Sequence, residues 1–254
     1  MLSIIIPTMQ KDNDILNMLI EELTDKDCIG EIIIIDNSLK GLYFPSNKVR
    51  VIIPKSNLYV NPSWNLGVNE AKFEYIGILN DDIIFPQNIF KQIYNFISDN
   101  EHCGLVGLDT IPKTTKSEFL CYPIDSEISI YPIDYRCNSW GSAIFGRKEN
   151  FYEIPENLKI WCGDDYIFKM NTNNGFINYK IVNVILKLCK IENNLSWDKT
   201  VWYFVSRPSA SFYCHNNILL SQCQAFWNRE NRKRKLNDKR KRLMDNQIIY
   251  NYVL

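Results

Sequence analysis

Short apolar runs alternate with stretches of helically spaced apolar residues along the N-terminal part of the chain. The runs are rich in β-branched side chains and end at proline or polar residues, which predicts buried strands. They cover residues 2–7, 31–38, 49–54, 75–82 and 103–110. Helical spacing predicts helices over residues 15–23, 64–71 and 89–97, and residues 163–170 look like the start of another. This alternation predicts an α/β fold whose mostly parallel sheet is flanked by helices.

Polar side chains follow three of these strands at the point where each strand ends. They are Thr8, then Asp36, Asn37 and Ser38, and finally Asn80, Asp81 and Asp82. Parallel strands end at a common edge of the sheet, and ligands of such sheets bind beyond that edge. We therefore expect these side chains to lie together and to face a ligand.

The pattern becomes less regular in the second half of the chain. Residues 112–135 predict a loop or a small sheet insertion, residues 139–143 a turn of small side chains, and residues 181–188 another strand. Beyond residue 196 the chain is aromatic and then basic, with a helical pattern. We therefore expect a first domain over residues 1–196 and a mostly helical extension over residues 197–254 that packs on it.

Two pairs of adjacent carboxylates are candidates for chemistry. Asp81 and Asp82 repel each other unless a cation neutralises them, and Mg²⁺ or Mn²⁺ prefers such oxygen ligands. A solvated turn that caps the next helix is the alternative. Asp164 and Asp165, after Gly163, could supply a general base, or they could simply cap the helix that follows.

Other classes of site find little support in the sequence. It contains neither G-x-G-x-x-G nor G-x-x-x-x-G-K-[ST], which disfavours a classical dinucleotide site and a P-loop. The two histidines, His102 and His215, have no serine or cysteine partner in a recognisable motif. Asp36 could contact a ribose or base, or it could form an Asx-turn.

Charge and cysteine usage point to a soluble protein of a reducing compartment. The eight cysteines form no C-x-x-C pair, and no apolar run is long enough to span a membrane. The N-terminus begins with a strand and has no charged leader. We expect a cytoplasmic protein.

The net charge is zero, but the charges are unevenly distributed. Residues 229–242 form a basic segment with nine Lys or Arg and two acids. This segment could pack on the acidic body as a solvated helix, or contact an anionic membrane peripherally. It could also bind nucleic acid, which we do not expect because no other feature supports it.

Six segments, in order, resemble those of family 2 glycosyltransferases of the GT-A (Rossmann-like) fold. SIIIPT resembles the opening strand, EIIIIDNS the second strand and NLYVNPSWNLGVNEA the Asn-rich segment before a helix. ILNDDI resembles the metal motif, NSWGSAIFGRKENF the segment that leads to the acceptor, and WCGDDYIF the G-E-D motif. The similarity in order and spacing covers residues 1–196. It implies a mixed, mostly parallel sheet and an enzyme that uses nucleotide sugars.

The resemblance also implies roles for individual residues. Asp165 would be the catalytic base and Asp164 its acidic neighbour. Asp82, with Asn80, would hold Mn²⁺ or Mg²⁺. The nucleotide sugar, linked to UDP, GDP or dTDP, would contact Thr8, Asp36, Asn37, Asn57, Asn65, Asp81 and Gly163. A hexose or deoxyhexose would pass with inversion to a hydroxyl of a glycan or lipid-linked acceptor. Trp140 and Trp161 could stack on a sugar or pack in the core.

Three positions depart from the family pattern. Asn80 replaces an aspartate of the metal motif, and Trp64 replaces an arginine before the N-x-G. Asn193 stands where relatives often carry a metal-binding histidine, with His215 as a further candidate. Two alternatives therefore stay open, a catalytically degenerate GT-A binding protein and a nucleotidyltransferase of similar fold. The second lacks its Gly-rich basic signature in residues 8–14.

Overall fold

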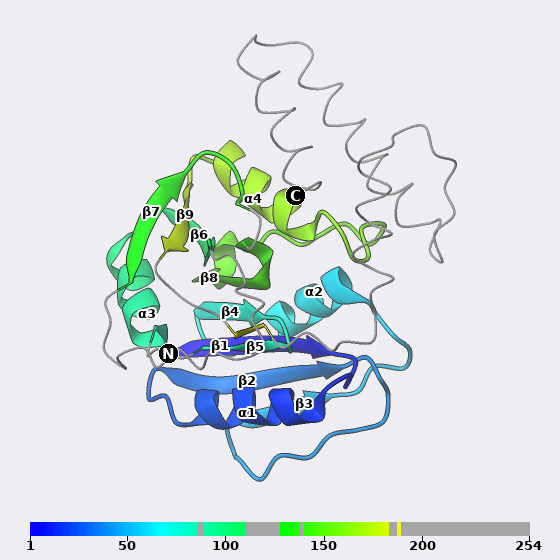
Figure 1. Cartoon of the computed structure of the whole chain (residues 1–254). Coiled ribbons are helices and arrows are strands. Elements are labelled where there is room, and N and C mark those ends of the chain that lie inside the picture. The colour runs from blue at the N-terminus through cyan, green and yellow to red at the C-terminus, as the bar shows by residue number, and fades with distance from the viewer. Residues whose placement is uncertain (86–88, 110–127, 138–139, 183–186, 189–254) are drawn as a thin grey trace.

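A computed structural model describes residues 1–85, 89–109, 128–137, 140–182 and 187–188 (Figure 1). The strands are β1 (Leu2–Thr8), β2 (Ile29–Asp36), β3 (Val49–Ile52), β4 (Tyr75–Leu79), β5 (Ile83–Ile84), β6 (Cys103–Leu108), β7 (Ser129–Ile133), β8 (Ala143–Arg147), β9 (Ile177–Val182) and β10 (Lys187–Leu188). The α-helices are α1 (Asn13–Thr24), α2 (Val60–Glu70), α3 (Phe90–Asp99) and α4 (Gly163–Asn173). Two single 3-10 turns are η1 (Trp140–Ser142) and η2 (Lys148–Asn150).

Eight strands form one mixed, mostly parallel sheet in the order β3-β2-β1-β4-β8-β6-β9-β7. β1 pairs in parallel with β2 and β4, β2 with β3, and β6 with β9. β8 runs antiparallel between β4 and β6, and β7 runs antiparallel at the edge beside β9. The predicted fold class is confirmed.

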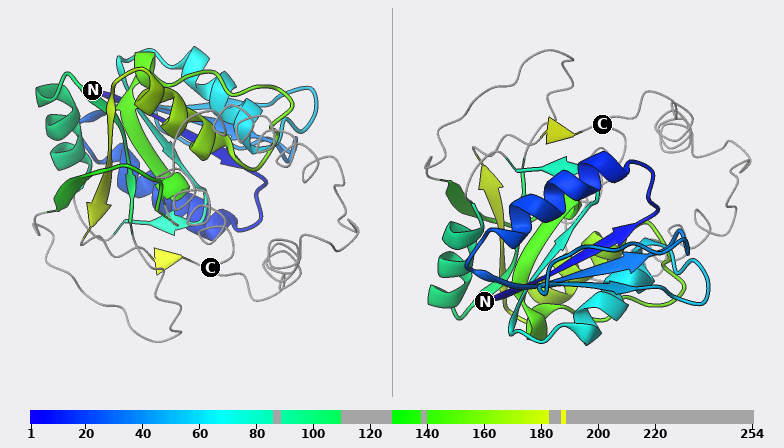
Figure 2. Two further views of the ribbon diagram at one scale, coloured as in Figure 1. Left: turned by 90° about the horizontal axis from the view of Figure 1, so that it is seen from above. Right: turned by 90° about the horizontal axis from the view of Figure 1, so that it is seen from below.

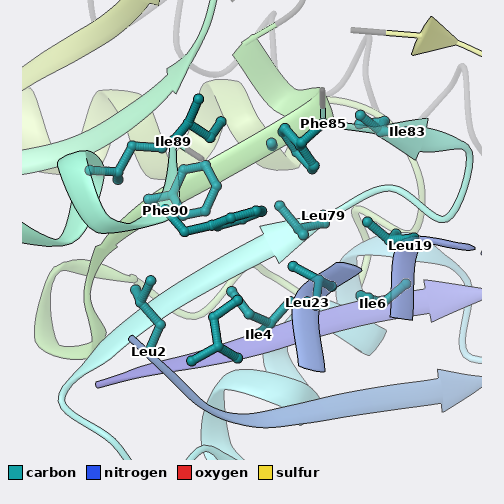
Figure 3. Close-up of a cluster of buried hydrophobic side chains, with 14 of the residues drawn as sticks. Leu2, Ile4, Ile6, Leu19, Leu23, Leu79, Ile83, Phe85, Ile89 and Phe90 are labelled. Atoms are coloured by element: carbon teal, nitrogen blue, oxygen red, sulfur yellow. The ribbon is translucent and has the colours of Figure 1, made fainter. Parts of the chain in front are cut away.

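The sheet is covered on both faces, which explains why its central strands are apolar throughout. Ile4 and Ile6 of β1 point into one core with α1 and α3, whereas Ile5 points into the other with α2 and α4. Figure 2 shows α1 in front of the sheet in the view from below and α4 in front of it from above. Figure 3 shows the first core, where Leu19 and Leu23 of α1 lie over β1.

α1 illustrates how the sequence sets its own boundaries. Asp12 caps the helix by accepting a hydrogen bond from the N–H of Ile15 at 3.1 Å. The apolar residues that predicted the helix are those it buries, namely Ile15, Leu16, Leu19, Ile20 and Leu23. The helix is amphipathic because a 3.6-residue period keeps these side chains on one stripe.

The structure corrects three sequence-based boundaries. Residues 143–147 form the buried strand β8 between β4 and β6, whereas the expected turn extended to Ala143 and no strand was predicted after it. The strand expected over 181–188 is instead β9, which begins at Ile177, followed after a gap by the short β10. α2 begins four residues before the expected start at Trp64.

Several expectations concern residues outside the described ranges. They include the 196/197 domain boundary, the helical extension, the basic segment 229–242, Asn193 and His215, and all stay predictions. Where the structure is described, no helix is long and apolar enough to cross a membrane. Of the eight cysteines, Cys28, Cys103, Cys137 and Cys162 are described, and these four are free.

Candidate active site

Polar residues at the ends of β1 and β4 meet at one edge of the sheet. The hydroxyl of Thr8 donates to Asp81 Oδ2 at 2.6 Å, which joins two strand ends that are 73 residues apart in sequence. The parallel register of β1 with β4 causes this approach. The arrowheads of β1 and β2 mark the same edge in Figure 1. The expected gathering of strand-end side chains is therefore found for Thr8, Asp36 and Asp81.

Asp36 is fully buried at the end of β2. Its carboxylate accepts hydrogen bonds from Ser38, Gly41 and Gln10. Burial raises its pKa, but these hydrogen bonds outweigh that effect and bring the pKa of Asp36 below its ordinary value. Asp36 is therefore a buried anion that holds residues 38–41 in place, which is the Asx-turn expected as the alternative role.

The turn after β4 carries Asn80, Asp81 and Asp82. Burial raises the pKa of Asp81 above its ordinary value, against the lowering effect of the Thr8 hydroxyl. Loss of solvent around the carboxyl group of Asp82, together with the adjacent Asp81, raises the pKa of Asp82, although the residue as a whole is exposed. Both shifts mean that a negative charge is costly here unless a cation approaches.

The donor set of this turn suits a hard divalent ion that shares substrate oxygens. Mg²⁺ is commonly held by one or two carboxylates together with water and phosphate oxygens. Within the described residues, no three acidic, histidine or cysteine side chains form a complete metal site. Asp81 and Asp82 could thus hold an ion only with ligands from the substrate, from water or from elsewhere in the chain.

Three asparagines expected at the nucleotide sugar make contacts within the chain. Asn65 donates to Ile154 O at 2.8 Å and accepts from Ile154 N at 3.0 Å, so both ends of its buried amide are engaged. Asn37 accepts from Leu58 N and donates to the Ser63 hydroxyl. Asn57 accepts from Tyr59 N at 2.7 Å.

These bonds tie the β2 end to the start of α2 and tie α2 to the loop that contains Ile154. We therefore assign Asn37 and Asn65 to the support of the site. Their amides make hydrogen bonds within the chain, and their expected contact with the nucleotide sugar stays a prediction.

The second acidic pair lies in the first turn of α4 and is held by an arginine. Arg136 Nε donates to Asp165 Oδ1 at 2.8 Å, and Arg136 Nη1 lies 3.2 Å from Asp164 Oδ2. The exposed fractions of the three side chains are 9% for Arg136, 18% for Asp164 and 15% for Asp165. One guanidinium thus balances one of the two negative charges of the pair and bonds to both carboxylates in a largely dry environment.

The two oxygens of Asp165 differ in their surroundings. Oδ1 accepts from Arg136, whereas Oδ2 is buried and has no hydrogen-bond partner among the described residues. Burial raises the pKa of Asp165 to about 6, while Arg136 opposes this rise and Asp164 adds to it. A buried carboxylate with one unpaired oxygen and a pKa near neutrality is a candidate for a general base.

A short turn connects the two acidic pairs. Asn80 N donates to Ser142 O at 3.0 Å, at the point where β8 begins beside the end of β4. Gly141, the preceding residue, packs so closely on the Asp164 carboxylate that a Cβ atom would overlap it. η1 therefore spaces the Asp81–Asp82 turn from the Asp164–Asp165 pair.

α2 holds the loop that leads into α4. The amide of Asn61 donates to Leu158 O at 3.0 Å and to Trp161 O at 3.2 Å. Cys162 then adopts a left-handed backbone with φ 63°, and Gly163 follows with its Cα against the Asn61 side chain, where a Cβ would clash. The glycine is required here by the packing of α2 on α4.

Comparison with known proteins identifies the family. The sequence model described as Glycosyl transferase family 2 matches residues 3–153. The chain belongs to this family. The matched segment includes β1 through β8 and so contains both the Asp81–Asp82 turn and Arg136.

Solved structures with the same fold include several glycosyltransferases. The mannosyltransferase PcManGT from Pyrobaculum calidifontis, in complex with GDP-Man and Mn²⁺, matches with a TM-score of 0.58 at 11% identity, over 87% of this chain and 68% of that one. TarS of S. aureus (residues 1–349) matches with a TM-score of 0.52 at 12% identity, over 89% of this chain and 72% of that one. GalNAc-T7 with UDP, GalNAc and Mn²⁺ matches with a TM-score of 0.56 at 12% identity, over 91% of this chain and 55% of that one. Curated protein sequences give no match.

Two residues of this family 2 domain contact the proposed site residues in the structure, although the sequence analysis did not predict them. Arg136 is the only Lys or Arg between Lys116 and Arg147, and this isolation among acidic residues was the available signal. Gln10, between β1 and α1, bonds to Asp36 and had no such signal. Trp140, one of two candidate sugar platforms, is fully buried against β6 and belongs to the core, while Trp161 is half-buried.

Proposed function

We propose that this family 2 chain is an inverting glycosyltransferase. It moves a hexose or deoxyhexose from a nucleoside-diphosphate sugar to a hydroxyl group of a glycan or a lipid-linked acceptor. The observation that carries the proposal is the Asp164–Asp165 pair. It sits in the first turn of α4, is held by Arg136, and leaves one buried oxygen of Asp165 open.

The donor binds at the edge formed by the ends of β1, β2 and β4. PcManGT and GalNAc-T7, which share the fold, were solved with GDP-Man and with UDP, each with Mn²⁺. In this chain Asp82, with Asp81 or Asn80, would hold the ion. When bound, the ion supplies positive charge that stabilises the departing diphosphate.

Asp165 acts as the general base. Its unpaired Oδ2 takes the proton of the acceptor hydroxyl. At the same time the oxygen of that hydroxyl forms a bond to the anomeric carbon. The bond from the anomeric carbon to the diphosphate oxygen breaks on the opposite face, and the nucleoside diphosphate leaves with the electron pair. A single displacement of this kind inverts the configuration of the sugar.

Arg136 orients this base. Because it bonds to Oδ1, it directs Oδ2 away from itself, and its charge keeps a larger share of Asp165 ionised. Asp164 shares the guanidinium and is fixed in turn by Gly141. Asp164 thus assists the base by sharing its counterion.

Donor binding and slow donor hydrolysis test the proposal. UDP-, GDP- and dTDP-sugars are titrated with Mn²⁺, with Mg²⁺ and with EDTA, using wild type and Asp82→Ala. We expect one donor class to bind in a metal-dependent way and Asp82→Ala to abolish that dependence. Asp99→Ala, at the distant end of α3, serves as the matched control.

The alternatives give different results. A catalytically degenerate binding protein would bind a donor with metal yet hydrolyse and transfer none of its sugar. If no donor binds under any of these conditions, the transferase proposal is wrong.

A further inference from the structure

Asp36 has no acceptor capacity left for a ligand. Oδ1 accepts from the N–H of Ser38 at 3.0 Å and from its hydroxyl at 2.6 Å. Oδ2 accepts from Gly41 N at 2.8 Å and from Gln10 Nε2 at 2.8 Å. A carboxylate offers about four lone-pair sites, so the chain itself fills them all. A nucleobase could bond to Asp36 only by displacing one of these donors.

Gln10 has an acceptor oxygen to offer, whereas the acceptor sites of Asp36 are occupied by the chain. Its Nε2 donates both hydrogens, one to Asp36 Oδ2 and one to Gly41 O at 3.2 Å. Because both partners are pure acceptors, the orientation of the amide is fixed by chemistry. Oε1 therefore points away from them. The residue is partly exposed, and no described residue donates to Oε1.

Gln10 connects the end of β2 with the ends of β1 and β4. Its backbone N–H donates to the Thr8 hydroxyl at 2.9 Å, and Thr8 donates in turn to Asp81. A continuous hydrogen-bonded path thus runs from Asp36 through Gln10 and Thr8 to Asp81. Gln10 is thus the residue that links the buried anion of β2 to the proposed diphosphate end.

The backbone of Gln10 is held in a strained conformation. Its φ of 52° lies in the left-handed region, which a non-glycine residue adopts at a free-energy cost. The three hydrogen bonds of this residue stabilise that conformation. A strained residue maintained by specific bonds is typical of functional sites, where it presents a group in a fixed direction.

We propose that Oε1 of Gln10 reads the nucleobase of the donor by accepting a hydrogen bond from a ring N–H. This selects uracil, thymine or guanine, which carry such a donor, against cytosine or adenine, which carry a ring acceptor instead. The inference rests on the proposed function and extends it by naming the class of base. Asp36 then acts as a positioning residue for Gln10.

Calorimetric titration of nucleoside diphosphates tests this reading. UDP is compared with CDP and with N3-methyl-UDP, and GDP with ADP, all with Mn²⁺. In wild type we expect the base with a ring N–H to bind about tenfold more tightly than its counterpart within at least one of these sets, because an acceptor that faces no donor loses its hydrogen bond. In Gln10→Ala this ratio should fall to about one.

Two controls separate base reading from support of the fold. Met9→Ala removes an exposed neighbouring side chain and should keep the wild-type ratio. Thermal unfolding shows whether Gln10→Ala is folded. If the role of Gln10 were merely structural, Gln10→Ala would weaken the binding of all nucleotides equally. The ratio of their affinities would then stay as in wild type. If Gln10→Ala does not fold, the wild-type comparison of UDP with N3-methyl-UDP and of GDP with ADP decides.

The failures can be told apart. If nucleotides bind but wild type does not separate the members of either set, or if Gln10→Ala keeps the ratio, the base-reading role is overturned and the transferase proposal stands. If no nucleotide binds to wild type, both are overturned.

Discussion

The chain contains two pairs of adjacent aspartates, and their surroundings are opposite. Asp164 and Asp165 are bonded to Arg136, with side chains that are largely buried. Asp81 and Asp82 lie at a turn where Thr8 donates one hydrogen bond. The charge of Lys11 acts on both, but no ion pair with Lys11 is described. The same dipeptide therefore has a built-in counterion in one place and lacks one in the other.

This difference teaches how charge assigns a role to a carboxylate pair. A pair with its own arginine has a counterion for one of its two charges, and the remaining charge favours uptake of a proton. A pair without a cation is favoured only when a cation arrives with the ligand. On this reasoning we propose that the pair held by Arg136 performs proton transfer and that Asp81 and Asp82 bind the metal and diphosphate.

The largest effect should come from Asp165→Asn. The amide keeps the shape of the side chain but cannot take a proton, so we expect turnover to fall about 10²–10⁴-fold. Donor affinity, measured by titration, should change little. Sugar transfer under saturating donor is the readout, with Asp99→Asn as a control at a distant surface position. Wild-type turnover in Asp165→Asn would remove this residue from the chemistry.

Arg136→Met should strongly destabilise the fold. It leaves two buried carboxylates without their counterion, which costs about 3–5 kcal/mol in comparable buried pairs. Lys180→Met is the control, because Lys180 pairs with Asp109 through side chains that are each 31% exposed, and such exposed pairs contribute about 0–1 kcal/mol. Urea unfolding of the two variants compares them directly. Equal losses of stability would mean that Arg136 is no more than a surface partner.

The pH dependence gives the subtlest test. Because the base must be ionised and the pKa of Asp165 is about 6, kcat/KM should fall as the pH drops below about 6. Arg136 lowers this pKa, so a folded Arg136→Met variant should show its midpoint at higher pH.

The stability of that variant should change with pH in the opposite direction to its activity, with a midpoint that also lies at higher pH. A carboxyl group whose folded pKa lies above its unfolded value stabilises the fold at low pH. This contribution is lost as the pH rises through the folded pKa. A profile that does not move in Arg136→Met would contradict the role of Arg136 at the base.

Much of the fold followed from the sequence because its signals are local. The apolar stripe of α1 has a clear helical period, and β1 and β2 are continuous apolar runs rich in β-branched residues. The polar residues after these strands meet because parallel strands share an edge. β8 was missed because its five residues, AIFGR, carry no alternation and follow a run of small residues.

The details of the site depend on contacts that no local pattern encodes. Arg136 and Asp165 are 29 residues apart and come together only through the path of β8 and α4. Asparagine is equally suited to a ligand and to a backbone group. Whether Asn65 faces a sugar or Ile154 is decided by the packing of α2 against a loop 89 residues away.

The direction of β8 determines where the chain tolerates insertions. Leu79 ends β4 beside Ala143, the first residue of β8, so residues before Ala143 lie at the proposed catalytic edge. Arg147 ends β8 at the opposite edge, where it bonds to Glu74 and Tyr75. Lengthening the connection before Ala143 would therefore reshape what the acceptor meets. Lengthening the connection after Arg147 would add residues behind the sheet, away from the substrate.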